Sequence, residues 1–312
     1  MPKLRLRRAI AQSAVLCCVT LLLVACTSSV RANPDSAEDK PTVLTTFTVL
    51  ADMARNVGGE HVRVASITKV GAEIHGYEPT ASDLRRASGA DLILDNGLGL
   101  EAWFQRFVAD VDAPHVVVSD GVRPVPIAED AYAGRPNPHA WMSPTAGVQY
   151  VGNIARALVG LDPAHAADYR RNAERYTARL RDLQEELVTA LDRLPEDRRA
   201  LVTCEGAFSY LARDAGLQEK YLWPVNAEQQ ATPQRVAAVV DFVRERRIAA
   251  VFCESTVSPE TMLRVADTGR ARFGGTLYVD SLSAPDGPVP TYLDLLRHDV
   301  DTIVRGLSVA QP

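Results

Sequence analysis

Short apolar runs alternate with amphipathic segments along two parts of the chain, which is the pattern of strands alternating with helices. In the first part, four apolar runs predict strands at Val43–Leu50, Val62–Ile67, Asp91–Asp95 and His115–Ser119. Segments of helical periodicity follow at Ala51–Val57, Thr80–Ser88, Leu100–Val111 and Ser143–Leu161. The second part repeats the pattern, with predicted strands at Ala200–Cys204, Lys220–Trp223, Ala249–Cys253 and Thr276–Val279. Its predicted helices are Ala207–Ala215, Thr232–Arg246, Ser258–Thr268 and Thr291–Leu307.

One long amphipathic segment separates the two parts. From about His165 to Leu194, apolar residues recur at steps of three and four, which is the stripe of a single helix about 45 Å long at ~1.5 Å per residue. Strands that alternate with helices imply parallel sheets covered on both faces. We therefore predict an α/β fold in which two lobes, each with parallel sheets flanked by helices, are joined by one long backbone helix.

The beginning of the chain has the features of a bacterial export signal. A basic start is followed by an apolar stretch from Ala9 to Ala25, which is short for a membrane span and typical of a signal peptide. The stretch ends in Leu-Val-Ala before Cys26, which resembles a lipobox, so we expect Cys26 to carry a lipid. An uncleaved membrane anchor is the alternative. The folded part is therefore expected outside the cytoplasm, at the cell surface or in the periplasm, held to the membrane by its lipid.

These features predict five segments along the chain. They are a signal peptide (1–25), a polar and flexible tether (26–40), an N-terminal α/β lobe (41–162), the long linking helix (163–196) and a C-terminal α/β lobe (197–312).

The net charge excludes one class of partner, and the cysteine count indicates a disulfide. The chain has 34 Lys and Arg against 39 Asp and Glu, and its leader contains four of the basic residues, which leaves 30 against 39. A folded part this acidic is not expected to bind nucleic acid. Beyond Cys26 only Cys204 and Cys253 remain, and each ends a predicted strand. In an exported protein two such cysteines favour a disulfide, with two buried free thiols as the alternative.

Candidate ligands for a metal ion lie next to the predicted strands. His75 and His139 occupy loops rich in Gly or Pro after the second and fourth strands, while Glu205 and Asp280 each follow a strand of the second part. Proteins with parallel α/β sheets bind small molecules and ions beyond the carboxyl ends of the strands. Glu254 has a similar position, and any of these acids also suits the first turn of a helix, so position alone does not choose among them.

Several motifs in order resemble those of a known family. They are HGYEPTASD (75–83), GLGLEAW (97–103), NPHAW (137–141), EGAFSY (205–210) and Asp280-Ser281. Together they resemble the zinc/manganese family of metal-binding lipoproteins, the solute-binding components of ABC importers, over about residues 42–307. The resemblance implies two α/β lobes with a metal ion held between them by His75, His139, Glu205 and Asp280. It also implies an ABC permease and its ATPase as partners, and we expect the receptor to be a monomer.

The expected cargo follows from the third ligand. In zinc importers of this family the position of Glu205 is commonly histidine, and a His-rich acidic loop often precedes the second ligand, whereas residues 122–138 here contain no histidine. Sites rich in carboxylates suit Mn²⁺ or Fe²⁺, which places the chain in the manganese-like subgroup. Zn²⁺ and Fe²⁺ remain alternatives, because almost any such site binds Zn²⁺ more tightly than Mn²⁺ in vitro.

Other function classes fit the sequence less well. Gly97-x-Gly99-x-x-Ala102 approximates a dinucleotide fingerprint, but its third position is Ala and its strand is not the first. An exported metal-dependent hydrolase would need an open metal position, and the chain has neither a His-Glu-x-x-His nor a Gly-x-Ser-x-Gly motif. We therefore predict that the protein is not an enzyme. An adhesin, a role attached to relatives of the family, is the other alternative.

Overall fold

The computed structural model describes residues 40–104, 111–129, 132–225 and 231–308. The chain divides into residues 1–40 and a compact unit of residues 41–312, and every helix and strand discussed below belongs to the compact unit. The predicted signal peptide and Cys26 lie outside the described residues. Within the described residues, no helix has both the length and the apolar character needed to cross a membrane.

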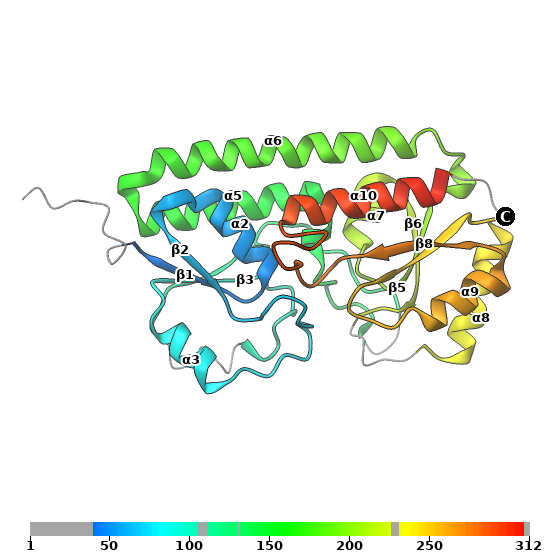
Figure 1. The fold of residues 1–312 in the computed structure, drawn as a ribbon, viewed down its shortest axis with the longest axis horizontal. Coiled ribbons are helices and arrows are strands. Elements are labelled where there is room, and N and C mark those ends of the chain that lie inside the picture. The colour runs from blue at the N-terminus through cyan, green and yellow to red at the C-terminus, as the bar shows by residue number, and fades with distance from the viewer. Residues whose placement is uncertain (1–39, 105–110, 130–131, 226–230, 309–312) are drawn as a thin grey trace, which may run out of the picture. The chain divides into compact units, whose positions relative to one another are not determined.

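The first lobe is built on a parallel four-stranded sheet in the order β2-β1-β3-β4 (Figure 1). Its strands are β1 (Thr42–Thr45), β2 (Arg63–Ser66), β3 (Leu92–Asp95) and β4 (His115–Val117). Its helices are α2 (Thr48–Gly58), α3 (Ala81–Ser88) and α5 (Pro144–Leu161). Successive side chains of a strand point to opposite faces. Val43 accordingly joins the core formed with α2 and α5, whereas Leu44 joins a smaller core with Ala87 of α3.

The second lobe contains two pairs of parallel strands. They are β5 (Ala200–Glu205) with β6 (Gln218–Trp223), and β7 (Ala250–Glu254) with β8 (Arg272–Leu277). Its helices are α7 (Ser209–Ala215), α8 (Pro233–Glu245), α9 (Glu260–Gly269) and α10 (Tyr292–Ser308). A core that includes Val251 packs under α8 and α9, whereas the neighbouring Phe252 belongs to the core beneath α10. The prediction of parallel sheets covered on both faces is confirmed in each lobe.

Helix α6 (Ala166–Leu191) runs alongside both lobes (Figure 1). It contacts α2 and α5 of the first lobe and α7 and α10 of the second. Its buried residues form the predicted stripe: Tyr169, Ala173, Tyr176, Leu180, Leu183, Leu187 and Leu191. The prediction of one long helix joining two lobes is confirmed. Short 3-10 turns lie elsewhere, at η1 (Gly59–His61), η3 (Ala140–Met142), η4 (Pro163–His165) and η5 (Glu196–Arg198).

Several predicted boundaries differ from the structure, and the differences are clearest in three elements. The predicted strand Val43–Leu50 ends at Thr45, and α2 begins at Thr48, because an apolar run does not distinguish a buried strand from the buried first turn of a helix. Strand β8 begins at Arg272 rather than Thr276, since two glycines interrupt the apolar pattern there. The predicted helix Leu100–Val111 forms turns up to Trp103, and residues 105–110 lie outside the described residues.

Candidate metal centre

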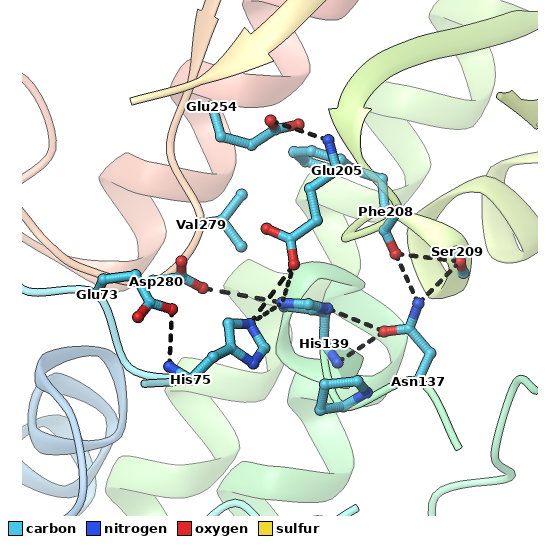
Figure 2. A network of polar contacts seen from close by, with 12 residues as sticks. Glu73, His75, Asn137, His139, Glu205, Phe208, Ser209, Glu254, Val279 and Asp280 are labelled. Atoms are coloured by element: carbon cyan, nitrogen blue, oxygen red, sulfur yellow. Dashed lines mark hydrogen bonds and ion pairs between the residues drawn. The ribbon is translucent and has the colours of Figure 1, made fainter. Parts of the chain in front are cut away.

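The four side chains predicted as metal ligands meet in one buried place (Figure 2). His75 comes from the loop between β2 and α3, and His139 directly precedes η3. Glu205 is the last residue of β5, and Asp280 lies three residues beyond the end of β8. Their side chains are 7%, 0%, 2% and 2% exposed, respectively. Two loops of the first lobe and two segments of the second therefore contribute one polar side chain each.

The distances suit a shared ion. Nε2 of His75 and Nε2 of His139 are 3.0 Å apart, and Oε1 of Glu205 lies 3.6 Å and 3.8 Å from these two nitrogens. Oδ1 of Asp280 is 3.8 Å from His139 Nε2, and the ligand atoms of His75, His139 and Asp280 all lie within 4.8 Å of one another. Ligands about 2.1 Å from a tetrahedral ion are about 3.4 Å apart. These separations allow one small cation to lie between the two histidines and either carboxylate.

Asn137 determines which nitrogen of His139 faces the site. The Asn137 amide nitrogen donates to the Gly206 carbonyl (2.6 Å) and to the Ser209 hydroxyl (3.1 Å). Its Oδ1 therefore accepts, and it receives the backbone N–H and Nδ1–H of His139, each at 3.0 Å. With the proton on Nδ1, the lone pair of His139 lies on Nε2, where a metal ion can use it.

Glu73 accepts backbone N–H groups of the loop that carries His75, as Asn137 does for His139. Its carboxylate oxygens accept the backbone N–H groups of His75 (2.8 Å) and Gly76 (3.0 Å). In Figure 2 the Glu73 carboxylate lies beside that of Asp280. Because Glu73 is only half-buried, it is an acid at the margin of the otherwise buried site.

Glu205 is braced by its own lobe. Cys204, the preceding residue, forms a disulfide with Cys253 of β7, as the cysteine count indicated. The backbone N–H of Glu205 donates to Oε2 of Glu254 (3.1 Å), and the next N–H, that of Gly206, donates to the Trp223 carbonyl (2.9 Å). Glu254 thus contacts the backbone of Glu205, whereas the Glu205 side chain faces the histidines. The two acids had equivalent positions in the sequence, and the structure places them differently.

Burial shifts the protonation of these groups. Burial lowers the pKa of His75 to about 4, opposed by the charge of Glu73, and burial together with the neighbouring His75 lowers the pKa of His139. Burial, followed by the Glu73 charge, raises the pKa of Asp280 to about 7, and burial raises that of Glu254 to about 8. Both imidazoles are therefore neutral at pH 7, which is the form that binds metals.

The Asp280 carboxylate is buried with one oxygen unsatisfied: among the described residues, nothing donates a hydrogen bond to its Oδ1. Burying an ionised carboxylate without a partner costs several kcal/mol, on the order expected for an uncompensated buried charge. A cation between the four side chains would remove this cost.

A cavity of about 540 Å³ reaches His75 from the side. Its lining includes Leu98, Gly99, Tyr132 and Arg135, so it opens beside the glycine-rich turn that resembled a dinucleotide motif. That turn has a structural role, since the Glu101 carboxylate accepts the N–H groups of Asn96 and Gly97. These N–H groups are therefore occupied and do not face a phosphate site.

Two of these residues, Glu73 and Asn137, were not singled out as functional from the sequence. Each stands two residues before a predicted histidine ligand and accepts that histidine's backbone N–H. A polar side chain at this spacing is the signal that would have identified them, since short polar side chains commonly bond to backbone groups two residues on.

The chain is similar to proteins of metal transport. The family described as "Zinc-uptake complex component A periplasmic" matches residues 43–306. The iron-binding protein YfeA of Yersinia pestis is 49% identical over 287 residues, 92% of each chain. The manganese-binding lipoprotein MntA of Halalkalibacterium halodurans is 34% identical over 299 residues, 95% of this chain and 98% of the relative. A solved structure of the Mn-bound periplasmic metal binding protein of Candidatus Liberibacter asiaticus matches with a TM-score of 0.81 and 38% identity, covering 86% of this chain and 100% of that one.

Proposed function

This chain belongs to the family described as Zinc-uptake complex component A periplasmic, and from that premise we propose that it is the extracytoplasmic receptor of an ABC metal importer. It captures a divalent transition metal ion between its two lobes and delivers the ion to a permease and its ATPase. The observation that carries this proposal is the meeting of two imidazoles and two carboxylates from opposite lobes in one buried place.

The proposed ligands are His75, His139, Glu205 and Asp280. Two neutral imidazoles and two carboxylates give a dication a nearly neutral set of ligands, which is the condition for burying the ion at low cost. Four protein ligands also complete a tetrahedral shell, whereas a catalytic zinc site keeps one position open for water or substrate. This set supports carriage of an ion and gives no role to catalysis.

Manganese is the proposed cargo. Half of the ligand set is carboxylate, which suits harder ions such as Mn²⁺ and Fe²⁺. The relatives named above are described as iron-binding and manganese-binding, and the solved structure is Mn-bound. Zinc and iron are the alternatives, since affinity in vitro favours Zn²⁺ whatever the cell loads.

The ion reaches the site from the solvent through the cavity beside His75, the one ligand that lines it. A lipid on Cys26 and the tether of residues 26–40 keep the receptor, acting as a monomer, at the membrane where the permease lies. The domain boundaries of this proposal are those predicted above, with lobes at 41–162 and 197–312 on either side of the linking helix at 163–196.

Metal analysis of the full-length protein purified from its native host, grown with adequate metals, tests the proposal. We expect one Mn per chain by elemental analysis. One Zn or Fe per chain would overturn manganese as the cargo and leave the receptor function standing. Protein that contains no metal and that binds none of Mn²⁺, Fe²⁺ or Zn²⁺ on titration would overturn the receptor function itself.

A further inference from the structure

The two residues on either side of Asp280 are each held by the first lobe. The Val279 carbonyl accepts the indole N–H of Trp141 (3.1 Å), two residues after His139. The Ser281 hydroxyl accepts the backbone N–H of Gly71 (2.7 Å), four residues before His75. The segment that carries Asp280 is therefore bonded to both loops that carry the histidines.

Ser281 is the centre of a buried network that crosses between the lobes. The Leu282 N–H donates to Oγ1 of Thr48 (3.0 Å), the first residue of α2. The Ser281 hydroxyl donates to the Leu282 carbonyl (3.0 Å), so in the contact between Thr48 Oγ1 and Ser281 Oγ (3.4 Å) the Thr48 hydroxyl is the donor. Ser281 is 6% exposed and Thr48 8%, so little water is present to replace the bonds among Ser281, Thr48 and Leu282 when they break, whereas Gly71 is exposed.

Gly71 has the backbone conformation that this contact needs. Its φ of +77° lies in the left-handed region, which side chains other than glycine rarely adopt. An added Cβ would meet nothing within 4 Å, so space does not require glycine here. Glycine is favoured because its left-handed backbone conformation presents the Gly71 N–H to Ser281.

We propose that Ser281 is a positioning residue that latches the loop of Asp280 to the loop of His75 and thereby sets how fast the ion leaves. The inference rests on the proposed function, because it concerns release from the same site. Asp280 has to withdraw from the histidines before the ion can depart. Its withdrawal breaks the bonds of Ser281 to Gly71 and Thr48, so these bonds oppose release.

Release kinetics of Ser281→Ala test the latch. Full-length protein loaded with Mn²⁺ is mixed with excess chelator, and the rate of metal release is followed by stopped flow. We expect Ser281→Ala to release the ion about fivefold faster or more, the factor for losing roughly one net hydrogen bond. The rate of metal association should stay within about twofold of the natural protein, because the ligands are unchanged.

Ser283→Ala is the matched control. The Ser283 hydroxyl donates to the Ala284 carbonyl and accepts the Val289 N–H, so both of these hydrogen bonds stay within the same segment. Its removal should leave the release rate unchanged. Thr48→Val approaches the latch from α2 and should also speed release. The double variant Ser281→Ala/Thr48→Val should be less than additive, which a general loss of stability would not produce.

The outcomes separate the latch from the function on which it rests. If the natural protein binds no metal, the proposed function fails. If the natural protein binds metal and Ser281→Ala and Thr48→Val both release it at the rate of Ser283→Ala, the latch is wrong and the receptor function stands. Should Ser281→Ala fold poorly, as judged by its melting temperature without metal, Thr48→Val alone decides by the same rate comparison.

Discussion

Glu205 and Asp280 lie in the same lobe and face the same two histidines, but they are held by different means. Glu205 ends a strand, and a covalent disulfide and backbone hydrogen bonds of its own lobe brace it. Asp280 lies beyond its strand, in a segment held through side chains and N–H groups of the other lobe. One acid is therefore part of a rigid frame, whereas the position of the other depends on how the two lobes meet. From this comparison we expect both acids to contribute to affinity and the Asp280 segment to have the larger part in release.

The largest effect is expected from removing the braced acid. Glu205→Ala should weaken binding of Mn²⁺ by about 100-fold or more, because it removes one charge of a buried set that neutralises the ion. Glu254→Ala, one strand away, should cost far less affinity, since the Glu254 carboxylate accepts the backbone N–H of Glu205 and is not one of the proposed ligands. Isothermal titration of both variants measures the difference. Equal losses would contradict the ligand assignment.

Removing the brace tests why Glu205 is rigid. The double variant Cys204→Ser/Cys253→Ser should lower the free energy of unfolding by about 2–4 kcal/mol, measured by urea denaturation, since the disulfide closes a 49-residue separation. The same change, or reduction of the natural protein, should speed metal release because Glu205 gains freedom. If the reduced and oxidised proteins release metal at the same rate, the disulfide stabilises the fold without bracing the site.

The orientation of His139 should matter nearly as much as a ligand. Asn137→Ala removes the acceptor of Nδ1–H and the link to the Gly206 carbonyl, and we expect a loss of about 10- to 100-fold in metal affinity. Asn137→Asp keeps an acceptor for the imidazole and should recover part of the loss. Titration calorimetry of the two variants makes the comparison, and an unchanged affinity in Asn137→Ala would refute the orienting role.

The raised pKa values predict how stability depends on pH. Without metal, the folded protein holds protons on Asp280 and Glu254, with pKa values of about 7 and 8, that the unfolded chain has already lost. Their contribution to stability is fully present below about pH 4 and is lost progressively as the pH rises from about 4 to about 8. Bound Mn²⁺ favours ionised Asp280, so the rise in melting temperature on adding Mn²⁺ should be larger at pH 8 than at pH 6. Calorimetric scans that show a smaller rise at pH 8 would contradict this.

The smallest effect concerns the acid at the margin of the site. Glu73→Gln removes a negative charge but keeps one acceptor oxygen for the His75 loop, so association of Mn²⁺ should slow by about two- to fivefold at low salt. Glu78→Gln, an exposed acid of the same loop, is the control. Stopped-flow association rates that fall equally in both variants would show a general effect of net charge.

Much of the fold follows from local patterns. The stripe of α6 and the alternation of short strands with helices each depend on residues close together in the chain, which is why they could be predicted. Boundaries failed where two elements share one apolar run, as at Thr45 and Thr48. They also failed where glycines interrupt a strand, as in β8.

The four candidate ligands and the cysteine pair were also accessible from the sequence, because each belongs to a short motif or a count. The contacts that position them were not. Gly71 and Ser281 are 210 residues apart, and Thr48 and Leu282 are 234 apart. A hydrogen bond of that span depends on how two lobes meet, and no periodicity or local motif encodes it. Asn137 and Glu73 lie between these cases, since they act over two residues but on backbone groups that only a folded loop defines.

The continuous helix α6 has a consequence for delivery to the permease. It packs against helices of both lobes, so one continuous helix joins the two lobes. A wide separation of the lobes would require α6 to bend or to lose its packing against one of them. We therefore expect that delivery of each ion requires the displacement of a short loop and not a wide separation of the lobes.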